Sequence, residues 1–177
     1  PAGGRRDGLI HAIYGGVYGK DHGVLDGHPR TGGLLPPMAH LGPAAPCGLH
    51  LMESEGLGVD YLGSVFATQF NLRKVSRHVL RHEGAALAST DSDFLASDST
   101  DFHPTDVIED ADGSLLVCDT GGWYKLCCPT SQIAKPEVSG AIYRVRRAEA
   151  PKAVDPRGLA IDLKGAAPSE LAPYLGD

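Results

Sequence analysis

His103 is the residue of this sequence best suited to acid–base chemistry. It directly precedes Pro104, and the free pKa of a histidine side chain lies near neutrality. Such a group can accept a proton from the hydroxyl of a sugar-like substrate. A histidine here can equally hydrogen-bond a neighbouring loop. His103 is thus the candidate catalytic residue, with both interpretations open.

Arg73 and Lys74 are candidate cofactor-binding residues. Their guanidinium and ammonium groups match carboxylates, so they could pair with an acidic quinone cofactor. The alternative is that they are solvated charges beside a turn.

Trp123, Tyr124 and Lys125 are candidate substrate-binding residues within a long connection, residues 121–139. The rings of Trp123 and Tyr124 can stack on a sugar or cofactor, or anchor their own loop. Most connections run ~4–6 residues, and longer ones tend to be functional or disordered. Since this one contains aromatic residues and cysteines, which promote order, we expect an ordered loop packed across the face that holds His103.

Metal binding is not expected. The sequence DADG at residues 110–113 is typical of a hairpin turn, since no downstream glutamate completes a calcium loop. A looser acidic cluster is interpreted as a solvated edge; it consists of Asp91, Asp93, Asp98 and Asp101.

The cysteines are too irregularly spaced for a zinc site. Cys118 is predicted to be a buried free thiol in a strand. Adjacent Cys127 and Cys128 should be the reactive thiols, with Cys47 the better disulfide partner if one of them is oxidised.

Short strands must position these residues. Two runs, 106–109 and 114–119, flank the DADG turn, and a third run, 141–147, alternates apolar and basic residues. We interpret residues 102–147 as one antiparallel propeller blade. Another blade is expected over residues 43–101, with strands at 49–53, 64–70, 74–80 and 93–97. Residues 1–42 are expected to be a blade remnant containing a strand over 8–17.

The two blades align with each other. Pro46 matches Pro104, residues 63–67 match residues 113–117, and Arg77 matches Arg144. The predicted fold class is all-β: a partial β-propeller of about two to three four-stranded antiparallel blades with a short C-terminal helical tail.

Composition agrees with a turn-rich β protein of 177 residues, low in aromatic residues and rich in glycine and proline. The net charge of −6, with both signs mixed, gives no nucleic-acid footprint. No apolar run approaches the ~20 residues that span a bilayer. Because the first residue is Pro1, we expect that the beginning of the protein is missing. Residues 148–177 are interpreted as a linker and the start of a helical-repeat domain, with Ser169 capping a short helix.

Several stretches resemble the propeller of large bacterial "membrane-bound dehydrogenase" proteins: YGGVYGKDH, HLGPAAPCGL, FNLRKVSRHVL, DFHPTDVIEDADGSLLVCDTGGWYKLCCPTSQ and GAIYRVRR. In that family a glucose/sorbosone dehydrogenase-like propeller precedes HEAT-type repeats and a cytochrome c domain. The resemblance implies a slice of a six-bladed ring in an extracytoplasmic, periplasmic dehydrogenase of sugars or alcohols.

The same resemblance implies pyrroloquinoline quinone and calcium as cofactors, and electron transfer to a haem c domain outside this chain. The Arg-Asn-Pro-type segment common at a blade start in that wider group is replaced by Ala44-Ala45-Pro46. The alternative is a non-catalytic NHL-like propeller that binds a protein or glycan on the same face.

Overall fold

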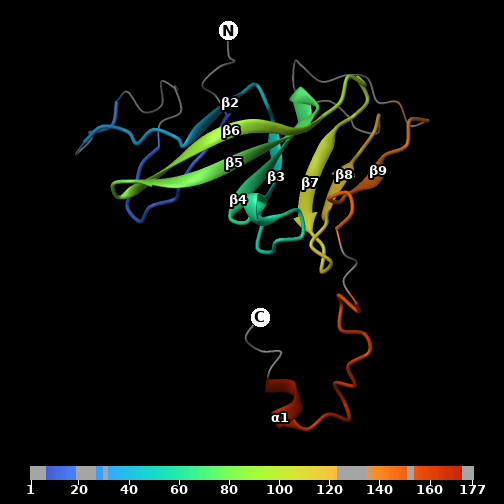
Figure 1. Ribbon diagram of the computed structural model, residues 1–177. Helices are drawn as coiled ribbons and strands as arrows, with labels where there is room; N and C mark the ends of the chain where they lie inside the picture. Colours follow the sequence, from blue (N-terminus) through green and yellow to red (C-terminus); the bar gives the residue numbers. More distant parts are fainter. Residues whose placement is uncertain are drawn as a thin grey trace.

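The computed structural model describes residues 7–18, 27–29, 32–122, 135, 137–150 and 154–172. Its strands form three antiparallel sheets of two, four and three strands, shown in Figure 1. The prediction of a mostly β protein with little helix is confirmed.

The two-stranded sheet pairs β1 (Asp7–Leu9) with β2 (Ala39–Gly42). The prediction of a strand over residues 8–17 is therefore wrong in extent, because β1 ends at Leu9. The chain turns at Gly15 and Gly16, where the Gly16 N–H donates to the Ile13 carbonyl at 2.8 Å. A turn closed by this bond cannot continue an extended strand.

The four-stranded sheet runs in sequence order through β3 (Pro46–Leu51), β4 (Ser64–Gln69), β5 (Lys74–Glu83) and β6 (Ala86–Ala96). Short 3₁₀ turns precede and follow β4: η2 (Val59–Tyr61) and η3 (Phe70–Leu72). The prediction placed the last strand at residues 93–97, but β6 is eleven residues long. Its first half consists mostly of small and polar residues without apolar alternation, so it carried no strand signal. Figure 1 shows the β5–β6 hairpin extending past the rest of its sheet toward β1 and β2.

The three-stranded sheet contains β7 (Pro104–Glu109), β8 (Leu115–Asp119) and β9 (Ala141–Val145). Leu115 and Val117 are fully buried, and alternation turns Cys118 to the opposite, half-covered face. The prediction of a buried Cys118 is therefore wrong in burial, although the thiol is free and lies in a strand.

The cross-strand register agrees with the predicted internal repeat. Arg77 lies opposite Phe66 and Arg144 lies opposite Leu116, and these two partners occupy equivalent repeat positions. The same hydrogen bond also recurs. Arg77 Nε donates to Ser64 Oγ at 3.0 Å. Its counterpart Arg144 Nη1 donates to Ser114 Oγ at 2.5 Å.

Two apolar clusters join the sheets into layers. One lies between the four- and three-stranded sheets and includes Phe66, Val107 and Val117. The other lies between the four- and two-stranded sheets and includes Leu9 and Val65. Neighbouring residues of β4 thus point into different clusters, which explains why every residue of β4 is buried.

The C-terminal part is a series of turns that leads to α1 (Pro168–Leu171), below the sheets in Figure 1. The prediction that Ser169 caps this helix is wrong. Ala167 is the N-cap residue, and its N–H donates to Glu170 Oε2 at 2.7 Å. Arg157 attaches this part to the three-stranded sheet through Asp110, at 2.6 Å.

Candidate functional site

His103 lies immediately before β7 and is buried. Its ring stacks on Phe70 of η3, with 4.6 Å between centroids and 30° between planes. Its Nδ1 lies 2.7 Å from the Gly121 carbonyl oxygen. Because a carbonyl only accepts hydrogen bonds, Nδ1 carries a proton and donates it. In the neutral ring, Nε2 is consequently the nitrogen that can accept a proton.

Asp119, the last residue of β8, fixes the backbone around this ring. One of its carboxylate oxygens accepts hydrogen bonds from the N–H groups of His103 and Gly121, each at 2.8 Å. The Thr120 N–H donates to the His103 carbonyl at 3.2 Å. The ring and its hydrogen-bond acceptor are therefore held by the same carboxylate.

The four-stranded sheet contributes the other side of the site. The Asn71 N–H donates to the Ala44 carbonyl at 3.0 Å, and the Phe70 N–H donates to the Ala45 carbonyl at 3.3 Å. These bonds join the start of β3 to the end of β4. Of the loops expected to converge on one face, those at Ala44–Ala45, Phe70–Asn71 and His103 do meet.

Arg73 and Lys74 have partners in the neighbouring strand and the segment that follows it. Arg73 Nη1 donates to the Asp98 carbonyl at 3.4 Å. Lys74 Nζ forms an ion pair with Asp93 Oδ1 at 2.7 Å. Both cations are therefore engaged by β6 and the segment that follows it.

The predicted substrate contacts Trp123, Tyr124 and Lys125 lie outside the described residues, as do Cys127 and Cys128. The described ends of the connection return to this face. The Gly122 N–H donates to the Val138 carbonyl at 3.0 Å. Lys135 Nζ forms an ion pair with Asp101 at 2.7 Å.

Cys47, at the start of β3, has an exposed position and a free thiol. Partial burial of the sulfur and the negative charge of Asp106 raise the pKa of this thiol above its ordinary value. The thiol is therefore mostly protonated at neutral pH, which disfavours both nucleophilic attack and metal binding.

A second polar cluster was missed in the sequence. His78 Nε2 lies 2.8 Å from Ser76 Oγ, and His78 Nδ1 lies 2.8 Å from Asp91 Oδ1. Gln69 Nε2 donates to the same serine oxygen at 2.7 Å. The signal was available, because Ser76 and His78 alternate with Val75 and Arg77 in a strand and so share one face.

The hydrogen-bonded series Ser76–His78–Asp91 has the residue types of a nucleophilic triad, but its surroundings do not suit catalysis. The serine oxygen is already engaged within the sheet, since Gln69 Nε2 donates to it at 2.7 Å and it donates to the Ala67 carbonyl at 3.3 Å. The cluster lies on the face of β5 that packs toward β1 and β2, and Ser89 Oγ donates from β6 to the Met38 carbonyl at 3.3 Å. Its role is to satisfy polar groups within a sheet interface.

Within the described part of the chain, no group of three or more His, Cys, Asp or Glu side chains could hold a metal ion. No described helix is both long enough and apolar enough to cross a bilayer.

The fold and the His103 face together define a class: an all-β protein of layered antiparallel sheets whose loops gather at one end. The chain belongs to the family described as a domain of unknown function (DUF7133), which matches residues 37–150. No curated protein and no solved structure matches the chain. The matched region contains β3 to β9, including the whole of the repeat and the His103 face.

Proposed function

We propose that the chain forms part of a β-propeller that binds a sugar or alcohol on the His103 face. The propeller would belong to an extracytoplasmic dehydrogenase that passes electrons to a cytochrome c domain of the full-length protein. The observation that carries this proposal is the orientation of His103, with Nδ1 bonded to Gly121 and Nε2 as the basic nitrogen of the neutral ring.

The propeller assignment is supported by the repeat. Two successive sheets begin at equivalent prolines and contain the same serine–arginine bond. They also pack face to face through one apolar cluster. Sheets that repeat along the chain and pack in this way are the unit of a propeller.

The proton transfer we assign to this chain is a single step. His103 Nε2 would accept the hydroxyl proton of the substrate, and the hydrogen bond from Nδ1–H to the Gly121 carbonyl would stabilise the resulting imidazolium. Asp119 holds both groups in register through its paired backbone bonds.

The described residues do not fit the quinone or calcium that the family resemblance implies. Lys74 is neutralised by Asp93, and Arg73 is bonded to the Asp98 carbonyl. The carboxylates of the described part do not form a calcium site. We therefore derive no step through these cofactors.

The test separates the two roles of His103 with two substitutions in the full-length protein. His103→Asn places an amide N–H near the position of Nδ1 and removes Nε2, whereas His103→Gln places an amide near Nε2 and removes Nδ1. We expect His103→Asn to lose dye reduction with sugar or alcohol substrates while its thermal stability stays close to that of the wild type. His82→Asn, at the exposed end of β5, is the matched control and should leave both unchanged.

Retained activity in His103→Asn would overturn the catalytic assignment. If His103→Gln alone lowers stability in that case, the imidazole serves to fix the Gly121 loop.

The second candidate is an NHL-like propeller that binds a protein or glycan on the same face without catalysis. The engagement of both cations by Asp93 and Asp98 favours it, because no charged cofactor pocket is then needed. Saturable glycan binding by a full-length protein that reduces no dye, with quinone and calcium added, would select this candidate.

A further inference from the structure

A pocket lies between the four- and three-stranded sheets, away from His103. It contains Tyr61 of η2, Phe94 of β6 and Arg147, just after β9, and we call it the Tyr61–Arg147 pocket. Tyr61 precedes β4 and Phe70 follows it, so the six residues of the strand separate Tyr61 from the Phe70 turn by roughly 17 Å. The volume of about 440 Å³ is that of a small-molecule site.

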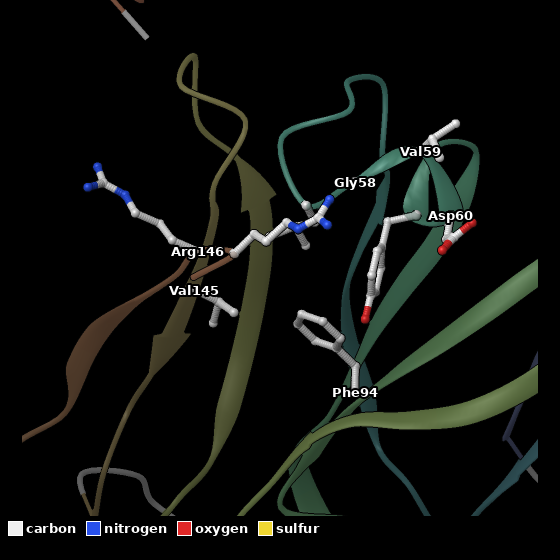
Figure 2. A pocket seen from close by; sticks show the side chains of 9 residues that line it. Gly58, Val59, Asp60, Phe94, Val145 and Arg146 are labelled. Atoms are coloured by element: carbon white, nitrogen blue, oxygen red, sulfur yellow. The ribbon is translucent and has the colours of Figure 1, made fainter. Parts of the chain in front are cut away.

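The wall of the pocket is aromatic and fixed in place. The rings of Tyr61 and Phe94 meet edge to face at 6.0 Å, and Phe94 also packs on Phe66 at 4.8 Å. Arg77 lies over the Tyr61 ring at 4.1 Å. Figure 2 shows Phe94 and Val145 approaching the pocket from the two different sheets. The two rings are nearly perpendicular, at 72°, so the wall offers an apolar corner without rearrangement.

Arg147 differs from the other arginines around it. Arg144 and Arg146 pair with Asp112, and Arg77 is held by Tyr61 and Ser64. Figure 2 shows the Arg146 side chain pointing away from Gly58. The guanidinium of Arg147, in contrast, has neither a hydrogen-bond nor an ion-pair partner among the described residues.

The position of the Arg147 guanidinium depends on Gly58. A β-carbon added at Gly58 would lie 2.7 Å from Arg147 Nη1, so any other residue would push the guanidinium away. Asp60 also lines this pocket, but no ion pair joins its carboxylate to Arg147, so the chain places a planar cation without a bonded carboxylate beside an aromatic wall. A guanidinium of this kind binds carboxylates through two parallel hydrogen bonds.

We propose that the Tyr61–Arg147 pocket binds a small aromatic carboxylate. The carboxylate pairs with Arg147, and the ring packs on Tyr61, Phe94 and Val145. This site is independent of the function proposed for His103, because the two lie at opposite ends of β4 and share no residue.

The experiment titrates the 177-residue chain with benzoate and follows the backbone amide resonances of Tyr61, Phe94 and Val145. Benzamide keeps the ring without the charge, and acetate keeps the charge without the ring. We expect saturation by benzoate at roughly millimolar concentration, with both comparison ligands about tenfold weaker. Equal affinities for benzoate and benzamide, or for benzoate and acetate, would overturn the proposal.

Arg147→Gln should weaken benzoate binding by about tenfold and leave benzamide unaffected, since only the charge-assisted bonds are lost. Arg81→Gln is the matched control, because Arg81 is exposed and its nearest carboxylate, Glu83, is 3.9 Å away. Arg147→Lys should bind benzoate with intermediate affinity, since lysine keeps the charge but cannot form the two parallel hydrogen bonds. Unchanged benzoate affinity in Arg147→Gln, or an equal loss in Arg81→Gln, would remove Arg147 from the site.

Discussion

Gly48 in β3 lies against β7, where the first strands of the four- and three-stranded sheets pack together. A β-carbon added there would be 2.4 Å from Asp106 Oδ1, 2.6 Å from Asp106 Cα and 2.9 Å from the Val107 nitrogen. Side-chain oxygens can rotate aside, but the two backbone atoms belong to β7 and move only with their strand. Gly48→Ala should therefore force the two sheets apart.

The size of the effect follows from these distances. Carbon atoms make favourable contact at about 3.5–4.0 Å, so the strands must separate by roughly 1 Å to admit the methyl group. Overpacking of this kind costs about 1–3 kcal/mol. The apolar cluster between the sheets, which includes Phe66 and Val117, would loosen at the same time. For a chain of this length we expect a melting temperature lower by roughly 2–12 °C.

Thermal and urea unfolding, followed by circular dichroism, measure this difference against Gly33→Ala. A β-carbon at Gly33 has no atom within 4 Å, so that variant should match or slightly exceed the wild type. Equal stability of the two variants would refute the close packing of β3 on β7. Adding Asp106→Ala should not rescue Gly48→Ala, because the new methyl group still meets the backbone of β7. A full rescue would show that the clash involves only the carboxylate.

Two further predictions concern ionisable groups. The Ser114 hydroxyl, with the Ser114 N–H, Arg146 and Arg144, lowers the pKa of Asp112 to about 2. The contribution of the Asp112 carboxylate to stability should therefore be present above about pH 4 and be lost as the pH falls toward 2. The free energies of urea unfolding of the wild type and Asp112→Asn should differ at neutral pH and converge near pH 2. For Cys47, whose thiol pKa is raised by burial and by Asp106, alkylation by iodoacetamide at neutral pH should be slow and should accelerate in Asp106→Asn. A Cys47 rate equal to that of free glutathione would contradict the raised pKa.

The strands and the repeat were predictable because they depend on local patterns. Prolines begin β3 and β7, glycines with positive φ precede Ser64 and Ser114, and arginines recur at equivalent positions. The first half of β6 was not predictable, because it forms a strand through pairing with β5 rather than through its own composition.

The candidate site was predictable only as a convergence of loops. The order of strands showed that the starts of β3 and β7 and the end of β4 would share one end of the sheets. The stacking of Phe70 on His103 and the choice of Gly121 as its acceptor depend on tertiary packing, which the sequence pattern does not contain. The engagement of Lys74 by Asp93 is likewise a cross-strand contact, produced by a register irregularity in the β5–β6 pairing between Val75 and Ser76.

The two copies of the repeat share a scaffold and differ in what their arginines do. Arg77 and Arg144 each bond the serine that follows the turn, which fixes the strands in register. In the second copy the turn supplies Asp110 and Asp112, so Arg144 is neutralised and the turn is closed by ion pairs. In the first copy the turn is longer and forms η2, so Arg77 instead lies over an aromatic ring. The Tyr61–Arg147 pocket thus arises at the point where the repeat is broken, since only the longer turn places an aromatic wall opposite the end of β9.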